Sequence, residues 1–188
     1  MLPPIRAFFL IMIAILCIPI TAQAAGGYWE FGAWRVIVDE IDTGEDLRRS
    51  CSAVTGGDGN MSASLQISNG DAGPPNYFPE LIINDHAIRH HTTVLKQGAP
   101  VYVWFDDEDT YDGAITQYVD PEGFQHAELR FPQDISQWVL LAMKRNGQMD
   151  VVMNGHATHS FFLNGFSASY LKMMDECGFT GAGVLDRD

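Results

Sequence analysis

The stretch from Phe161 to Cys177 constrains the fold more than any other part of the chain. Phe161-Phe162-Leu163 is typical of a strand, and Asn164-Gly165 ends it. Four residues then recur at helical spacing and so share one face of a predicted helix. They are Phe166, Tyr170, Met173 and Cys177. The stretch therefore predicts a helix that packs on a β-sheet and carries a cysteine to the core side.

The first 24 residues have the three parts of a secretory signal peptide. Met1 to Arg6 carries one positive charge, Ala7 to Ile20 is apolar, and Ala22-Gln23-Ala24 is a small-x-small cleavage site. The apolar run is shorter than the about 20 residues of a transmembrane helix. Cys17 follows a leucine rather than a small residue, which argues against lipidation. We expect residues 1–24 to be cleaved and the mature protein to be periplasmic or secreted.

The remaining residues have the size of one domain. Residues 25–177 contain no Pro- or Ser-rich linker and no internal repeat, which favours a single β-rich domain. Residues 178–188 are rich in glycine and polar side chains, and we expect a flexible C-terminal tail. The formal net charge of the chain is −13, which repels nucleic acid and anionic lipid. We therefore exclude nucleic-acid binding and membrane-surface binding as main functions.

Two cysteines, Cys51 and Cys177, remain after removal of the signal peptide. An oxidising compartment permits a disulfide, and two cysteines allow one pairing within the chain. The alternative is a pair of free thiols, one of them catalytic, but no histidine stands in a thiol-activating motif nearby. We expect a Cys51–Cys177 disulfide and no free thiol.

Short segments between Gly- and Pro-rich turns predict a mainly β domain. Met61–Ser68 alternates apolar and polar residues most clearly, and the run Tyr28–Ile41 also has one apolar face. Asn154-Gly155 predicts a tight hairpin, and Asn84-Asp85 another turn. The other strand candidates are Arg49–Val54, Tyr77–Ile83, Ala87–Leu95, Pro100–Phe105, Tyr111–Val119, Phe124–Phe131, Met149–Met153 and Thr158–Leu163.

A second helix is predicted after Asp134, which could cap it, as could Ser136. Asn146-Gly147 would end this helix. The elements together predict an antiparallel β-sandwich or curved sheet with two short α-helices packed on it. The residues expected on the buried face of the second helix are Ile135, Trp138, Val139, Ala142 and Met143.

Three segments stand out: Phe31-Gly32-Ala33-Trp34-Arg35-Val36, Leu81–Ile88, and Phe162–Tyr170 with Cys177. Together they resemble the invasion-associated locus B family of secreted α-proteobacterial proteins. In that family an F-G-x-W opener follows the signal peptide, and a Phe-rich strand leads through a glycine into a small-residue helix. The resemblance implies a β-rich periplasmic or outer-surface protein without catalytic machinery, and some members are tied to host-cell invasion.

The histidines are the candidate metal ligands, because imidazole binds Zn²⁺ and Cu²⁺. His90 and His91 are neighbours, so on a strand their side chains point to opposite faces and cannot both join one site. His126 stands alone in the sequence. No cofactor is the main expectation, and a zinc or copper site is the alternative. Its candidate ligands are His86, His90, His91, His156 and His159.

Other features lack a recognised catalytic or metal-binding pattern. The methionines form no Met-x-Met cluster, and Asp106–Asp109 with Asp112 lacks the spacing of an EF-hand, so we expect a charged hairpin tip. No G-x-S-x-G, H-E-x-x-H or phosphate-binding glycine loop is present.

The sequence therefore predicts a non-catalytic secreted cell-envelope protein that binds a protein or a surface component. One alternative is a periplasmic metal-binding protein with histidine ligands. A second is a small glycan or cell-wall hydrolase, because sequence spacing does not give the separation of two carboxylates in the fold.

Overall fold

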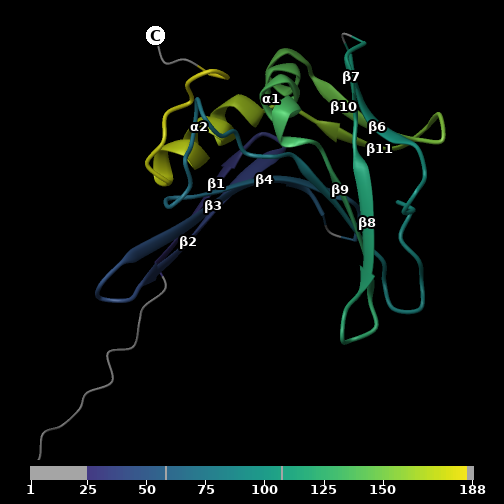
Figure 1. Cartoon of the computed structure of the whole chain (residues 1–188), viewed down its shortest axis with the longest axis horizontal. Coiled ribbons are helices and arrows are strands. Elements are labelled where there is room, and N and C mark those ends of the chain that lie inside the picture. The colour runs from purple at the N-terminus through teal and green to yellow at the C-terminus, as the bar shows by residue number, and fades with distance from the viewer. Residues whose placement is uncertain (1–24, 58, 107, 186–188) are drawn as a thin grey trace, which may run out of the picture.

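The structure, a computed structural model, describes residues 25–57, 59–106 and 108–185. The predicted signal peptide, with Cys17, lies outside the described residues, as do Asp107 and the last three residues. The described chain forms two antiparallel β-sheets and two short α-helices (Figure 1). The predicted fold class is confirmed.

The larger sheet has seven strands in the order β1-β2-β3-β4-β5-β9-β8. Its first four strands are consecutive hairpins, and residues 69–81 then lead to β5. The strands are β1 (Ala25–Phe31), β2 (Trp34–Asp42), β3 (Leu47–Gly56), β4 (Ser62–Ser68), β5 (Ile82–His86), β8 (Ala114–Val119) and β9 (Gln125–Arg130).

The smaller sheet has four strands in the order β11-β10-β6-β7. Asn154 and Gly155 join β10 to β11 with φ angles of 52° and 78°, so the predicted hairpin turn is confirmed. Gly113 alone separates β7 from β8, which divides the predicted strand Tyr111–Val119 between the two sheets. The strands are β6 (Val101–Phe105), β7 (Thr110–Asp112), β10 (Gln148–Met153) and β11 (His156–Phe162).

A short 3₁₀ helix, η1 (Gln133–Ile135), leads into α1 (Ser136–Arg145). Val139, Ala142 and Met143 are buried as predicted, but Trp138 is 58% exposed, so its predicted place in the core is wrong. Neither predicted cap is used, because Ile135 is the N-cap residue and no side chain caps the helix. Asn146 is the C-cap residue, as the sequence predicted.

The second helix, α2 (Phe166–Glu176), packs on β1, β2 and β3. Its predicted buried face is confirmed, and the ring of Phe166 meets Trp34 edge-on with 5.4 Å between ring centroids. At its end, Cys177 forms a disulfide with Cys51 of β3, and both cysteines are buried. The bridge fastens the last helix to an early strand.

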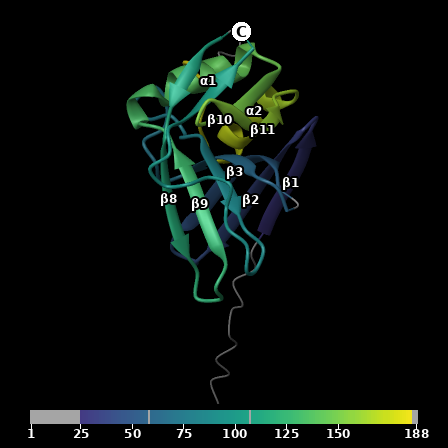
Figure 2. The same ribbon diagram turned by 90° about the vertical axis from the view of Figure 1, so that its right-hand side faces the viewer.

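The helices and the smaller sheet lie on the same side of the larger sheet (Figure 1, Figure 2). The main hydrophobic core fills the space between these layers and includes Leu65, Phe105 and Leu140. The strands of the larger sheet alternate accordingly, with one set of side chains buried and the other in contact with solvent.

Three strand predictions are wrong in detail. The run Tyr28–Ile41 is a hairpin, because the chain reverses at Gly32-Ala33. Asn84-Asp85 lies inside β5 rather than in a turn, and most of Tyr77–Ile83 precedes that strand. Ala87–Leu95 forms no strand, because side chains from other strands bind its backbone. The amide of Leu95 donates to the Asp85 carboxylate at 2.8 Å, and that of Thr93 donates to the Gln125 side chain at 3.1 Å.

The segment 178–185 also differs from the predicted loose tail. Gln137 and Lys144 of α1 donate to the carbonyl oxygens of Gly183 and Val184 at 3.0 and 2.9 Å. Val184 is buried in the core. Phe179 and Leu185 also pack against the core, so apolar contacts and hydrogen bonds together hold this segment in place.

Candidate binding face

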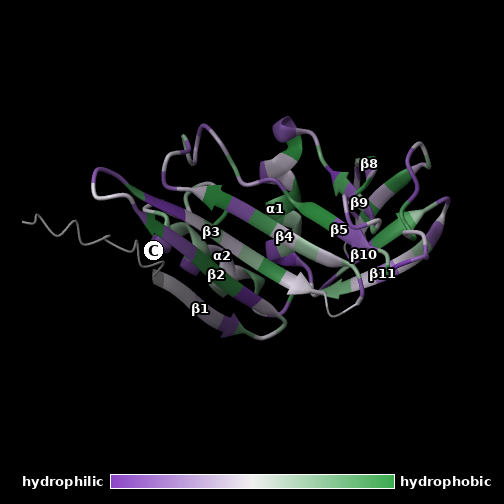
Figure 3. Cartoon of the chain, turned by 90° about the horizontal axis from the view of Figure 1, so that it is seen from below, coloured by the Kyte–Doolittle hydropathy of each residue, from purple (hydrophilic) through white to green (hydrophobic). Residues whose placement is uncertain are grey.

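The larger sheet has one face that the helices and the smaller sheet do not cover. We call it the outer face. In Figure 3, β1 to β5 lie in front of the helices, and no described element lies over them. On β4, for example, Leu65 and Ile67 point into the core, whereas Ser64 and Gln66 belong to the outer face. This face is the most extensive surface on which the fold displays side chains on regular strands.

Cross-strand pairing arranges the outer-face residues in rows. Hydroxyl and amide groups occupy the middle of the face, and the rows contain two arginines against three carboxylates. These rows are therefore much closer to neutral than the whole chain, whose net charge is −13. The central row runs across all seven strands and consists of Glu30, Arg35, Val54, Ser64, Ile82, Arg130 and Ala114. The row on one side of it is Tyr28, Ile37, Ser52 and Gln66, followed by a further row of Asp39, Ser50 and Ser68. The row on its other side is Ser62, Asn84, Glu128 and Thr116.

Three hollows open on the outer face. The first, of about 370 Å³, lies at the far end of the β2–β3 hairpin beside Arg48. The second, of about 240 Å³, lies beside Tyr77. The third, of about 480 Å³, lies beside Tyr28 and Arg35 at the β1–β2 turn. Ser68 lines both the first and the second, so these two hollows are adjacent.

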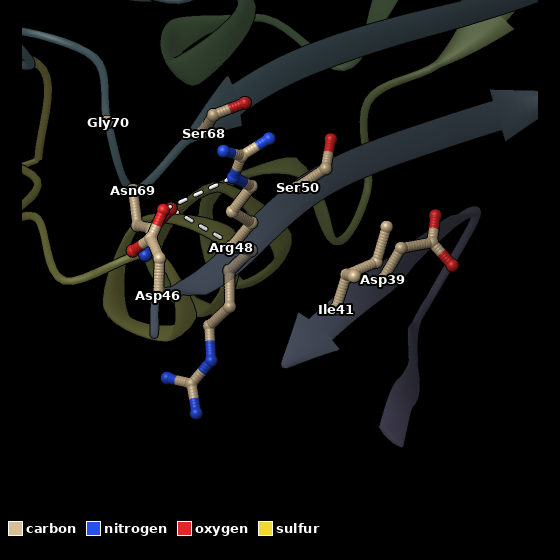
Figure 4. Close-up of a pocket in the computed structure, with 9 residues that line it drawn as sticks. Asp39, Ile41, Asp46, Arg48, Ser50, Ser68, Asn69 and Gly70 are labelled. Atoms are coloured by element: carbon tan, nitrogen blue, oxygen red, sulfur yellow. Dashed lines mark hydrogen bonds and ion pairs between the residues drawn. The ribbon is translucent and has the colours of Figure 1, made fainter. Parts of the chain in front are cut away.

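The first hollow, which we call the arginine hollow, is drawn in Figure 4. The amide of Arg49 donates to the Asn69 side chain at 3.1 Å, and the Arg49 guanidinium also reaches the carbonyl oxygen of Glu176 at 3.2 Å. Arg49 therefore holds the end of α2 in place. The Arg48 side chain is largely exposed and meets Asp46 at 3.2 Å, so it remains accessible to a ligand.

The second hollow, which we call the tyrosine hollow, combines side chains from four parts of the chain. Gln66, Ile67 and Ser68 come from β4, Ile82 from β5 and Arg130 from β9, while the segment before β5 supplies the rest. These remaining residues are Asp71, Tyr77 and Glu80. The sequence did not predict this hollow, because its residues meet only through the strand order.

Two contacts position the polar groups of the tyrosine hollow. The Asp71 carboxylate accepts the backbone N–H of Ser68 at 2.7 Å. The Arg130 guanidinium donates to Glu128 at 3.0 Å and lies 3.9 Å from a carboxylate oxygen of Glu80. Burial, and then the carboxylates of Glu80 and Asp71, raise the pKa of Tyr77, and Arg130 partly opposes this. The phenol of Tyr77 therefore stays protonated and can donate a hydrogen bond.

One end of the outer face carries a row of three rings. Tyr118 stacks on His126 with 4.9 Å between ring centroids, and His86 lies edge-on to the same imidazole at 4.5 Å. His126 Nε2 lies 2.9 Å from the Asp120 carboxylate, and its buried Nδ1 has no hydrogen-bond partner. This contact, followed by the N–H groups of Phe124 and Glu122, lowers the pKa of Asp120. Sequence reasoning missed His126 because only the strand register places it beside His86.

The other candidate metal ligands lie apart from this row. His90 and His91 are exposed on the segment between β5 and β6, and His156 and His159 lie on β11 of the smaller sheet. Burial lowers the pKa of His159, and the charge of Asp85 opposes this. Over residues 25–57, 59–106 and 108–185, no three or more histidine, cysteine, aspartate or glutamate side chains are grouped so as to hold a metal ion.

The acidic tip between β6 and β7 is bound into the fold. The Asp106 carboxylate accepts the backbone N–H groups of Gly147 and Gln148 at 3.1 and 3.0 Å. Asp109 forms an ion pair of 2.6 Å with Arg145. These carboxylates therefore fasten the β6–β7 hairpin to the turn between α1 and β10.

Comparisons of the chain with models of protein families, with curated proteins and with solved structures found no significant match. The resemblance to the invasion-associated locus B family stays a prediction. In the part of the chain that the structure describes, no helix combines the length and the apolar character needed to cross a membrane.

Proposed function

We propose that the protein is a non-catalytic, secreted protein of the cell envelope that binds a protein or surface component through its outer face. The observation that carries this proposal is the uncovered face itself, on which three hollows open. A flat and fully solvated face would offer a partner little shape to match. Hollows beside ordered strands offer both shape and fixed polar groups, which are the usual features of a binding surface.

The charge of the outer face supports the same function. A chain with a net charge of −13 repels most anionic envelope surfaces. In the strand rows of the outer face, Arg35 and Arg130 offset two of the three carboxylates, so these rows can approach a surface at a lower electrostatic cost than the net charge of the whole chain suggests. The disulfide and the signal-like leader support secretion, because disulfides persist in oxidising compartments.

The test is the binding of labelled mature protein to washed envelope fractions of the native cell. Ser64 lies in the central row of the outer face, whereas Ser160 is exposed on β11 of the smaller sheet. We expect Ser64→Arg to weaken saturable binding at least about tenfold, because a long charged side chain would block the face. The matched change Ser160→Arg should leave binding unchanged.

Thermal melting of both variants checks that they fold. Equal envelope binding by the wild type and a folded Ser64→Arg variant would contradict the proposed use of the outer face.

A further inference from the structure

We infer that the ligand of the outer face is a glycan, and that the tyrosine hollow binds one sugar unit of it. This inference rests on the proposed binding function and adds the chemical class of the ligand. It draws on the size of the hollow, the polar groups that line it, their charges and the neighbouring hollow.

The tyrosine hollow has the dimensions of a ring-sized ligand. Its volume of about 240 Å³ corresponds to roughly eight water molecules at ~30 Å³ each. The arginine hollow continues from it across Ser68 and has about 370 Å³. Two adjacent hollows on one sheet face suit a ligand made of repeated units, of which successive units occupy successive hollows.

The polar lining matches hydroxyl groups, which both donate and accept hydrogen bonds. Asp71 and Glu80 offer carboxylate acceptors, while Tyr77 and Arg130 offer donors. Gln66 offers both in one side chain. Ile82 adds an apolar contact for the C–H groups of a ring. A polyhydroxylated ring can use all of these groups at once, whereas a ligand with only donors or only acceptors would leave several unpaired.

The lining is also held in position before a ligand arrives. The Ser68 amide fixes Asp71 at 2.7 Å, and Glu128 holds the Arg130 guanidinium at 3.0 Å. Residues 77 and 80 lie at the entry to β5, where Tyr77 N–H also donates to the Gly73 carbonyl at 2.9 Å. Side chains that are already ordered lose less rotamer entropy on binding, which favours affinity for a small polar ligand.

The charges favour a neutral ligand over an ionic one. An anion in the hollow would meet the carboxylates of Asp71 and Glu80, and a cation would meet Arg130. Arg130 in turn lies within 3.9 Å of Glu80, so each charge is partly balanced by its neighbour. Neutral hydroxyls avoid the repulsion that either kind of ion would meet.

The test measures binding of the mature protein to neutral oligosaccharides and to isolated peptidoglycan sacculi. Calorimetry with tetramers of glucose and of N-acetylglucosamine reports the soluble ligands, and co-sedimentation reports the sacculi. We expect saturable binding to at least one of these probes. Tyr77→Phe and Glu80→Gln should each weaken it about tenfold. Tyr77→Phe removes a hydroxyl donor, and Glu80→Gln replaces a charged acceptor oxygen by an amide donor, with little change in volume in either case.

Matched changes outside the hollow provide the controls. Tyr102→Phe on β6 and Glu122→Gln in the β8–β9 turn alter the same chemical groups elsewhere, and we expect neither to change glycan binding. Full glycan binding by folded Tyr77→Phe and Glu80→Gln variants would show that the sugar binds elsewhere.

The remaining outcomes separate this inference from the proposed function. If no glycan binds but Ser64→Arg still reduces envelope binding, the glycan inference is wrong and the outer face remains the binding surface. Tight binding of a lysine-rich decapeptide that is lost in Glu80→Gln would also overturn it, in favour of a basic peptide. Envelope binding that survives Ser64→Arg would reject the proposed function itself.

Discussion

The α-carbon of Gly165 lies so close to the carbonyl oxygen of Phe31 that a side chain cannot fit between them. A Cβ atom at Gly165 would stand 1.7 Å from that oxygen, and the residue has a φ angle of 93°. The contact brings the β1–β2 turn against the start of α2, where the amide of Ala33 also donates to the Asn164 carbonyl at 3.0 Å. The connection between β11 and α2 therefore requires a glycine at position 165.

This contact predicts a large loss of stability in Gly165→Ala. The left-handed φ alone destabilises a fold by on the order of 1 kcal/mol when the residue is not glycine. Gly155→Ala measures that cost by itself, because Gly155 also has a left-handed φ and nothing lies within 4 Å of its Cβ position. In Gly165→Ala the backbone must also move away from Phe31, so we expect a loss of about 3 kcal/mol or more. Urea denaturation of both variants measures the difference. Equal losses would mean that the close approach does not constrain the fold.

The disulfide predicts a second effect on stability. Cys51 and Cys177 are 126 positions apart in the chain, and in the chain-entropy model a loop of this size stabilises the fold by about 5 kcal/mol. The measured stabilisation by a disulfide is often smaller than this model value, so we expect Cys51→Ser to lower the melting temperature by roughly 5 °C or more. Ser52→Ala, on the outer face next to it, is the control. Alkylation of two cysteines in the unreduced wild type would contradict the bridge directly.

The hydrogen bond between Asp120 and His126 predicts a pH dependence. Because the fold lowers the pKa of Asp120, the ionised carboxylate is the form that stabilises the β8–β9 turn. This stabilisation is complete above the usual aspartate pKa of about 4 and is lost as the pH falls through the lower folded value. We expect the wild type to be more stable than Asp120→Asn at pH 7 and pH 5, and the gap to close toward pH 2.

Melting temperatures at these pH values measure that gap, and Glu122→Gln is the control because its side chain is exposed. A gap that stays constant from pH 7 to pH 2 would show that ionisation of Asp120 is not its source.

The sequence predicts correctly those features whose residues are close together along the chain, and it fails where residues from distant strands meet. Local patterns were sufficient for the Asn154-Gly155 hairpin and for the buried face of α2. They failed for Ala87–Leu95, whose apolar residues are typical of a strand, because the side chains that bind its backbone come from β5, β8 and β9. The helical pattern also failed for Trp138, which is exposed. The spacing of apolar residues shows which side of a helix is buried, but it does not show how many residues at the edge of that side are covered.

The candidate site shows the same limit more clearly. The tyrosine hollow joins residues from β4, β5 and β9 with the segment before β5, and β9 lies between β5 and β8 although β6, β7 and β8 separate it from β5 in the chain. Sequence alternation shows that Ser64 and Gln66 face away from the core. It does not show that Arg130 lies in the row of Ser64, since that requires the strand order.

His159 predicts a pH dependence near neutrality. Burial lowers its pKa in the fold, so the unfolded chain binds a proton more readily. Stability is therefore highest above the usual histidine pKa of about 6.5 and falls as the pH drops below it, until the folded form also takes up the proton. We expect His159→Gln to lose less stability than the wild type between pH 7.5 and pH 5.

The exposed His156 on the same strand provides the control, because His156→Gln should follow the wild-type curve. Urea midpoints at the two pH values measure the change. A wild-type loss that His159→Gln does not reduce would assign the pH dependence to other groups.

The disulfide and the docking of α2 on β1 to β3 have a consequence for biosynthesis. Ribosomes add roughly 5–20 residues per second, so Cys177 is made roughly 6–25 s after Cys51, which precedes it by 126 positions. The residues of β1 to β4 are complete early in that interval, whereas α2, which covers the apolar side of β2 and β3 in the fold, is not yet made. The apolar side of β2 and β3 therefore lacks its cover until the last part of the chain is made, and the native bridge can form only after residue 177 has been added.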